Sequence, residues 1–277
     1  MIIPGSNGFL AVKVARSSGR SLNLIELERL KYGEKYVRLT FDVEGEDVYI
    51  VNTFHPNPDE IFLENLFIAE ILKEYGARKV FGIFPYIAYS KKGRKLIKGE
   101  LPPLKVLSKV YEVFEEIYSV NFSGEMDVVN ISAAELIGEY FAEKVGEKCI
   151  VISPDEASED LAKRVAEKIG TDYELMKKIR VDAENVIVSA KKMDLEGYEV
   201  LLIDDLIYTG SSMIQAIKLV KKSNAKRIFV SCVHALADMK DLLNIYIAGA
   251  DEIVATDTVL SYVSKISVAD LLAREIF

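Results

Sequence analysis

Two stretches of the chain share one pattern, and this recurrence restricts the possible folds more than any other feature. In the first, Gly76-Ala-Arg-Lys-Val-Phe81 follows an amphipathic helix and opens a strand that reaches Pro85. In the second, Asn224-Ala-Lys-Arg-Ile-Phe229 follows a helix ending near Ser223 and opens a strand that reaches Val233. A single recurrence about 150 residues later indicates a duplicated domain rather than a solenoid of short repeats.

Strands and helices alternate around both stretches. Apolar runs over 47–52, 150–153 and 251–256 predict strands, and apolar residues spaced three and four apart over 161–169 predict a helix. Alternating strands and helices form parallel sheets that helices cover on both faces. We therefore predict an α/β protein of two tandem domains, residues 1–140 and 141–277, with a terminal helix that can pack on either domain.

The segment from Val200 to Met213 carries the strongest chemical signal. It predicts a buried strand over Val200 to Ile203, then two acids, Asp204 and Asp205, and a loop that leads into a helix. Ligands of open α/β sheets bind beyond the carboxyl ends of the strands. The two acids therefore stand where a ligand is expected.

The loop that follows the acids is suited to an anion. Free backbone N–H groups at a helix N-terminus favour negative charge, and Thr209, Ser211 and Ser212 around Gly210 add hydroxyl donors. Asp204 and Asp205 would repel the same anion, so we expect them to bind sugar hydroxyls or a metal ion. The segment predicts a sugar-phosphate site, and the alternative is an ordinary strand–turn–helix with an N-cap.

Composition narrows the class of partner. Half of the 277 residues are hydrophobic, the net charge is −8, and no basic block is present, which argues against nucleic acid as a partner. Cys149 and Cys232 lie in apolar runs, so we expect buried thiols rather than disulfides or a cysteine-based metal site. No signal-like start or membrane-spanning run is found, so we expect a cytoplasmic protein without membrane contact.

With these segments in place, the chain resembles the ribose-phosphate pyrophosphokinases (phosphoribosyl pyrophosphate synthases) over nearly its whole length. The order and spacing of several short segments carry the resemblance: Pro85-Tyr-Ile-Ala-Tyr89, Ser153-Pro-Asp155, Lys178-Ile-Arg180, Leu206 to Met213, and Ala255-Thr-Asp-Thr258 with Val263-Ser-Lys265. The sugar loop alone would equally indicate a type I phosphoribosyltransferase, but a tandem duplication favours the synthase.

The resemblance implies two tandem phosphoribosyltransferase-like domains and a transfer of diphosphate from ATP to the C1 hydroxyl of ribose 5-phosphate, which releases AMP. It also implies a role for each matching residue: Thr209, Gly210, Ser211 and Ser212 for the 5-phosphate, Asp204 and Asp205 for the ribose hydroxyls and through them Mg²⁺, Asp155 for a metal, and Lys178 and Arg180 for charge on the transferred group. Positioning and electrostatic stabilisation do most of the work in such transfers.

The nucleotide half departs from the family pattern. Where the family has Phe-x-Asp-Gly-Glu, this chain has Leu30-Lys-Tyr-Gly-Glu34, and the only histidines are His55 and His234, so none lies near Ser123. The resemblance implies four remaining candidates for ATP binding: Glu34, Lys91, Lys92 and Arg94. Three functions stay open, namely a divergent synthase, a regulatory or binding paralogue, and a phosphoribosyltransferase acting on a nucleobase. The family also implies a homo-oligomer, with a partner synthase subunit as a further option.

Overall fold

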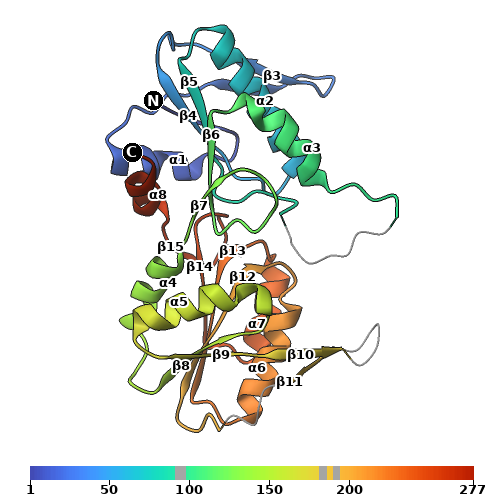
Figure 1. Ribbon diagram of the computed structural model, residues 1–277, viewed down its shortest axis with the longest axis vertical. Coiled ribbons are helices and arrows are strands. Elements are labelled where there is room, and N and C mark those ends of the chain that lie inside the picture. Colours follow the sequence, from blue (N-terminus) through green and yellow to red (C-terminus); the bar gives the residue numbers. More distant parts are fainter. Residues whose placement is uncertain (91–97, 181–185, 190–193) are drawn as a thin grey trace. The chain divides into compact units, whose positions relative to one another are not determined.

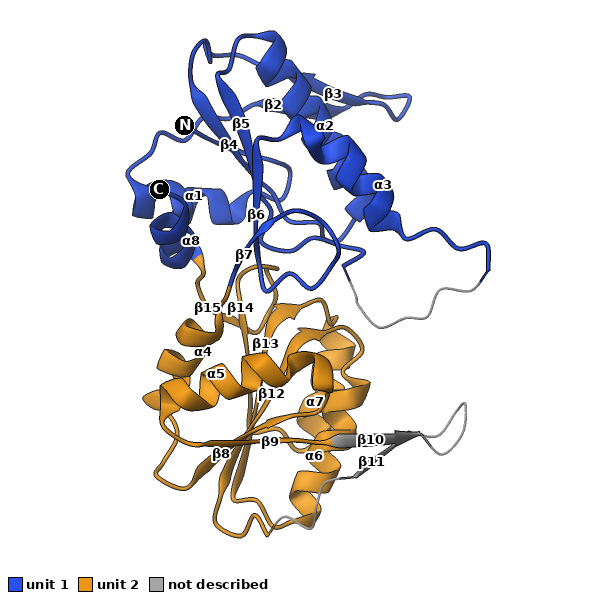
Figure 2. Cartoon of the chain, in the orientation of Figure 1, with its two compact units in different colours: residues 1–131, 269–277 blue, residues 132–268 orange. Residues whose placement is uncertain are grey.

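The computed structural model describes residues 1–90, 98–180, 186–189 and 194–277 (Figure 1). The chain forms two compact units, residues 1–131 with 269–277, and residues 132–268 (Figure 2). No helix in the described part of the chain is both long enough and apolar enough to cross a bilayer.

Unit 1 is built on a five-stranded sheet in which every neighbouring pair is parallel. In spatial order its strands are β1 (Ile2–Pro4), β4 (Asp47–Val51), β5 (Lys79–Ile83), β6 (Glu116–Val120) and β7 (Val129–Ile131). The hairpin of β2 (Glu26–Arg29) and β3 (Lys35–Arg38) stands apart from this sheet. The helices are α1 (Phe9–Ser18), α2 (Pro58–Glu74), α3 (Pro103–Val110), the 3₁₀ turn η1 (Tyr111–Val113) and α8 (Ala269–Ile276).

Unit 2 is built on a six-stranded sheet that is also parallel throughout. In spatial order its strands are β15 (Ser264–Ile266), β14 (Glu252–Thr256), β13 (Arg227–Ala235), β12 (Glu199–Ile207), β8 (Cys149–Ser153) and β9 (Asp172–Leu175). An antiparallel pair, β10 (Lys177–Arg180) and β11 (Val186–Ser189), follows β9 along the chain. The helices are α4 (Ala134–Ala142), the 3₁₀ turn η2 (Glu156–Ser158), α5 (Glu159–Ile169), α6 (Ser211–Lys222) and α7 (Met239–Ala248).

Burial of consecutive strand residues shows that the unit 2 sheet is covered on both faces. Successive side chains of a strand point to opposite faces, and every residue from Val200 to Ile203 in β12 has no exposed surface. Helix α5 packs on β8 and β12, and α6 packs on β12 and β13. The buried thiols Cys149 and Cys232 confirm the expectation from their apolar surroundings.

The recurrence in the sequence corresponds to a structural repeat. The strand order β1-β4-β5-β6-β7 of unit 1 recurs as β8-β12-β13-β14-β15 in unit 2. The registers agree as well, because Asp47 pairs with Lys79 in unit 1 and Glu199 pairs with Arg227 in unit 2. This register makes the position of Asn52, just after β4, equivalent to that of Asp204 in β12.

The two repeats exchange their last helices. Helix α4 follows β7 along the chain but packs on α5 of unit 2, whereas α8 follows β15 but packs on α1 of unit 1. Close contact holds α4 in place, since a Cβ added at Gly138 would lie 2.5 Å from Lys168 Cβ. This division differs from the expected domains, residues 1–140 and 141–277, because α4 belongs to the second compact unit and α8 to the first.

Candidate functional site

The two acids lie inside a strand rather than after it. We expected the strand to end at Ile203, but β12 continues to Ile207, and Asp204 pairs with Cys232 of β13. On the other side of β12 the ladder with β8 ends at Leu202. The acids are therefore held by β13 on one side, while the other side faces the loop that follows β8.

Ser158 from that loop connects to the acid pair. Its hydroxyl donates to Asp204 Oδ1, it lies 3.4 Å from Asp205 Oδ1, and it accepts a hydrogen bond from the Asp205 backbone N–H at 3.1 Å. Ser158 itself is buried. Ser158 was not among the site residues predicted from the sequence, although its place directly before α5 and three residues after Asp155 could have indicated it.

The environment of Asp204 favours its protonated form. Burial, followed by the negative charge of Asp205, raises the pKa of the Asp204 carboxyl to about 7. The hydrogen bonds from Ser158 and from the Asp205 backbone act the other way. A cation or hydroxyl donors beside this pair would relieve the unfavourable charge.

The loop after β12 brings hydroxyl groups to the N-terminus of α6. Thr209 Oγ1 and Ser211 Oγ lie 3.0 Å apart, and both residues are exposed. No side chain caps α6, and its first turn contains no acidic residue. The backbone N–H groups of that turn are thus available for an anion.

Gly210 allows this loop to form. Its φ of 70° lies in the left-handed region, and an added Cβ would stand 2.7 Å from Ile245 Cδ1 of α7. Glycine adopts this conformation without steric cost. The loop is therefore shaped both by backbone conformation and by close packing on α7.

The loop after β8 carries the expected metal ligand, Asp155. Its carboxylate accepts a hydrogen bond from the Ala157 N–H at 3.3 Å, and Ser153 Oγ donates to the Asp155 carbonyl at 2.7 Å. Within the described residues, no three His, Cys, Asp or Glu side chains are grouped so that they could hold a metal ion. Asp155, Asp204 and Asp205 therefore form no ready-made cluster of three carboxylates.

The remaining candidates are spread over both units. Lys178 and Arg180 lie in β10, where they pair with Val188 and Val186 of β11. Glu34 lies exposed between β2 and β3 in unit 1. The other ATP candidates, Lys91, Lys92 and Arg94, lie outside the described residues.

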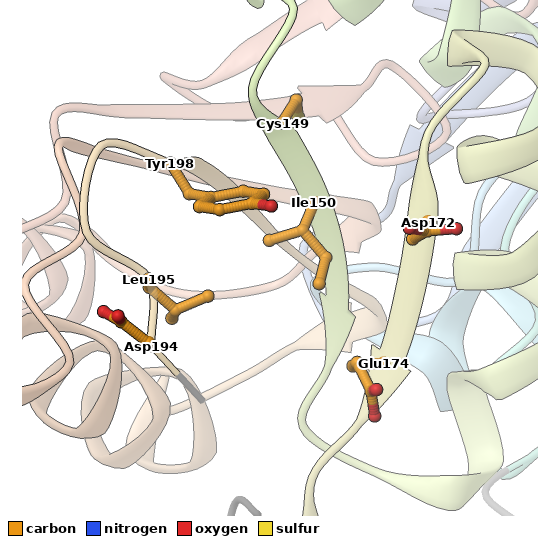
Figure 3. Close-up of a pocket in the computed structure, with 7 residues that line it drawn as sticks. All are labelled: Cys149, Ile150, Asp172, Glu174, Asp194, Leu195 and Tyr198. Carbon is orange, nitrogen blue, oxygen red and sulfur yellow. The ribbon is translucent and has the colours of Figure 1, made fainter. Parts of the chain in front are cut away.

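A hollow in unit 2 that lies away from the acid pair is unsuited to a sugar phosphate. It has a volume of about 160 Å³ and is lined by Cys149, Ile150, Asp172, Glu174, Asp194, Leu195 and Tyr198 (Figure 3). Cys149 begins β8 and Tyr198 precedes β12, so the hollow lies at the amino ends of these strands, opposite the acid pair. Its three carboxylates would repel a phosphate.

Comparison with known sequences gives full-length matches. Residues 1–113 match the N-terminal domain of ribose phosphate pyrophosphokinase, and residues 127–258 match the phosphoribosyl transferase domain. The chain is 39% identical to ribose-phosphate pyrophosphokinase 1 of Archaeoglobus fulgidus, covering 99% of this chain and 98% of that protein. It is 33% identical to the ribose-phosphate pyrophosphokinase of Thermococcus kodakarensis, covering 99% of both.

Comparison with solved structures shows the fold. The crystal structure of phosphoribosylpyrophosphate synthetase from Mycobacterium smegmatis matches with a TM-score of 0.86 at 23% identity. The match covers 100% of this chain and 97% of that one.

Proposed function

Since the chain belongs to the ribose-phosphate pyrophosphokinase family, we propose that it transfers diphosphate from ATP to the C1 hydroxyl of ribose 5-phosphate, which yields phosphoribosyl pyrophosphate and AMP. Family membership confirms the resemblance inferred from the sequence and the tandem phosphoribosyltransferase-like fold. One observation carries the proposal: the two carboxylates in β12 are followed, after a short loop, by the uncapped N-terminus of α6.

We assign the sugar phosphate to unit 2. The 5-phosphate is held by the first-turn N–H groups of α6 and by the loop of Thr209, Gly210, Ser211 and Ser212, because donors and helix dipole both favour an anion there. Asp204 and Asp205 accept hydrogen bonds from the ribose hydroxyls. The carboxylates thereby orient the ring while the phosphate fixes its other end.

The acid pair also fits Mg²⁺. Carboxylate oxygens are the ligands that Mg²⁺ takes, and this ion keeps water and substrate oxygens in its remaining positions. A divalent cation would offset the negative charge of Asp205 beside the buried Asp204 carboxyl. Asp155 is a further proposed ligand. When bound, Mg²⁺ neutralises charge on the phosphates of the substrates.

We propose that the nucleotide is bound by Glu34, Lys91, Lys92 and Arg94. Lys178 and Arg180 stabilise the charge of the transferred group. The C1 hydroxyl oxygen forms a bond with the β-phosphorus of ATP, and the bond from that phosphorus to the bridging oxygen breaks, so that AMP leaves with this oxygen. The hydroxyl proton passes to water. Lysine and arginine stabilise the negative charge of the phosphates during this step. We further propose that the protein is cytoplasmic and forms a homo-oligomer.

One assay separates the possible functions. The purified chain is incubated with ATP, Mg²⁺ and ribose 5-phosphate, and AMP is measured. The proposal predicts AMP from the unaltered chain and its loss in Asp204→Asn and Lys178→Ala. The control, Asp172→Asn, removes an exposed carboxylate from β9 and should retain activity. Ribose 5-phosphate binding without AMP would instead indicate a regulatory paralogue, and consumption of phosphoribosyl pyrophosphate with a nucleobase would indicate a transferase.

A further inference from the structure

The position in unit 1 that is equivalent to Asp204 contains an asparagine in a closed network. Asn52 is fully buried, and its amide Nδ2 donates to Glu64 Oε1 at 2.9 Å and to Asn65 Oδ1 at 2.8 Å. Its Oδ1 accepts the backbone N–H groups of Asn7 and Thr53, both at 3.1 Å. The Asn52 side chain therefore has protein partners on both its amide nitrogen and its amide oxygen.

Glu64 of α2 is the centre of this network. Its side chain is 1% exposed, and it accepts the Ser6 N–H at 2.7 Å as well as the Asn52 amide. The ammonium of Lys35 lies 2.5 Å from the other carboxylate oxygen. A buried carboxylate is strongly unfavourable without such partners. Glu64 therefore ties the first residue of β3 to the loops that follow β1 and β4.

The hairpin is joined to α2 at a second point. Arg29 and Lys35 stand directly opposite each other in the β2–β3 ladder, and like charges so placed repel. Glu60 and Glu64, four residues apart on one face of α2, neutralise them, since Arg29 also pairs with Glu60 at 2.7 Å. The last rung of the hairpin is thus clamped to α2.

The clamp lies beside the turn that carries Glu34. Arg29 Nη1 donates to the Gly33 carbonyl at 2.8 Å, and the Leu30 N–H donates to the Glu34 carbonyl at 2.8 Å. Tyr32, at the tip, is 73% exposed. The ion pairs at the base of this exposed turn therefore join it to α2.

We propose that Glu64, acting through Lys35, is a positioning residue that holds the turn over residues 30–34 for nucleotide binding. This inference rests on the proposed function, which gives Glu34 to the nucleotide. The clamp predicts a selective effect: its loss weakens ATP binding and leaves the sugar-phosphate site of unit 2 intact.

The test uses a fluorescent reporter at the tip. The chain contains no tryptophan, so Tyr32→Trp places a single one on the turn. In the full-length reporter protein, Glu64→Gln or Lys35→Met should lower the tryptophan anisotropy and weaken ATP affinity, measured from the fluorescence change, at least tenfold. The KM for ATP should rise similarly, while kcat and the KM for ribose 5-phosphate change less than twofold.

Arg38→Met is the matched control. It removes a positive charge from the same strand, but Arg38 pairs with Glu26 inside the hairpin and both are exposed. It should change ATP affinity less than twofold. If Glu64→Gln fails to fold, the ATP affinity of Lys35→Met tests the inference, because this variant keeps the hydrogen bonds from Ser6 and Asn52 to Glu64. ATP affinity equal to that of Arg38→Met would overturn the inference.

The two proposals can fail separately. If no AMP forms but Lys35→Met still loses ATP affinity, the diphosphate transfer is wrong and the positioning role of Glu64 stands. If AMP forms and Lys35→Met binds ATP as tightly as the control, the transfer stands and the positioning role is wrong.

Discussion

At the scale of single residues, Asp204 links stability to binding. Burial and the negative charge of Asp205 raise the pKa of its carboxyl to about 7, against an ordinary value of about 3.9. The folded state therefore holds this proton more tightly than the unfolded state. The contribution of Asp204 to the free energy of unfolding therefore falls as the pH rises from about 4 to about 7. Above that range, the whole loss of stability remains.

Asp204→Asn should consequently stabilise the ligand-free protein at high pH. We expect a gain of about 1–3 kcal/mol in the free energy of unfolding at pH 8 relative to the gain at pH 4, together with loss of ribose 5-phosphate binding. Urea unfolding at the two pH values measures the gain. Asp172→Asn, on an exposed part of β9, should show no such difference. An equal effect of Asp204→Asn at both pH values would contradict the buried charge.

Gly210 gives a second prediction at this scale. Gly210→Ala combines a left-handed φ with a steric clash against Ile245, whereas Gly19→Ala, at φ 67° with no atom within 4 Å, carries the backbone strain alone. We expect Gly19→Ala to cost about 1 kcal/mol and Gly210→Ala to cost about 2–4 kcal/mol, because overpacking adds to the strain. Thermal unfolding compares the two. Equal losses would show that α7 does not confine the loop.

At the scale of elements, local sequence pattern was sufficient for some boundaries and not for others. The helix expected to end near Ser223 ends at Lys222. This boundary could be predicted because the apolar spacing of the helix and the turn that follows it are local signals. The extension of β12 past Ile203 depends on pairing of Leu206 with His234 and of Ile207 with Ala235. Those partners are distant in sequence, so periodicity alone could not reveal the longer strand.

The site shows the same limit. The acids and the hydroxyl loop are consecutive in the sequence, and they were found as one motif in β12 and α6. Ser158 reaches them from another loop, and Glu64 reaches Lys35 from another element. A residue that tertiary packing brings to the site cannot be predicted from the spacing of residues within the motif.

The N-terminus of α6 provides a test at the scale of the element. Ser212→Asp places a negative charge in the first turn, which favours the helix by about 0.5 kcal/mol but repels a phosphate. We expect stability to be unchanged or slightly raised and ribose 5-phosphate affinity to fall at least a hundredfold, measured by calorimetry. Ser223→Asp, at the other end of α6, should lower stability and leave affinity intact. Undiminished affinity in Ser212→Asp would disprove the phosphate site.

At the scale of the whole molecule, the exchange of helices makes sequence position a poor guide to which unit a residue stabilises. Ile137 follows the last strand of unit 1 but is fully buried in unit 2, in α4. Leu272 follows the last strand of unit 2 but is fully buried in unit 1, in α8. Contacts of α8 with α1, including the hydrogen bond from Ser17 to Asp270, keep the terminal helix in its unit.

Truncating these two residues should therefore produce crossed effects. Leu272→Ala and Ile137→Ala each remove a buried side chain, at a cost of about 2–5 kcal/mol. Amide hydrogen exchange reports the stability of each sheet separately. We expect Leu272→Ala to speed exchange in β1 and β4 of unit 1, and Ile137→Ala to speed it in β8 and β12 of unit 2, because α8 packs on α1 and α4 packs on α5. Each variant is the control for the other. The prediction is wrong if Ile137→Ala speeds exchange in the strands that precede it and Leu272→Ala speeds exchange in the strands of residues 141–277. That result would mean that each terminal helix packs with its own repeat.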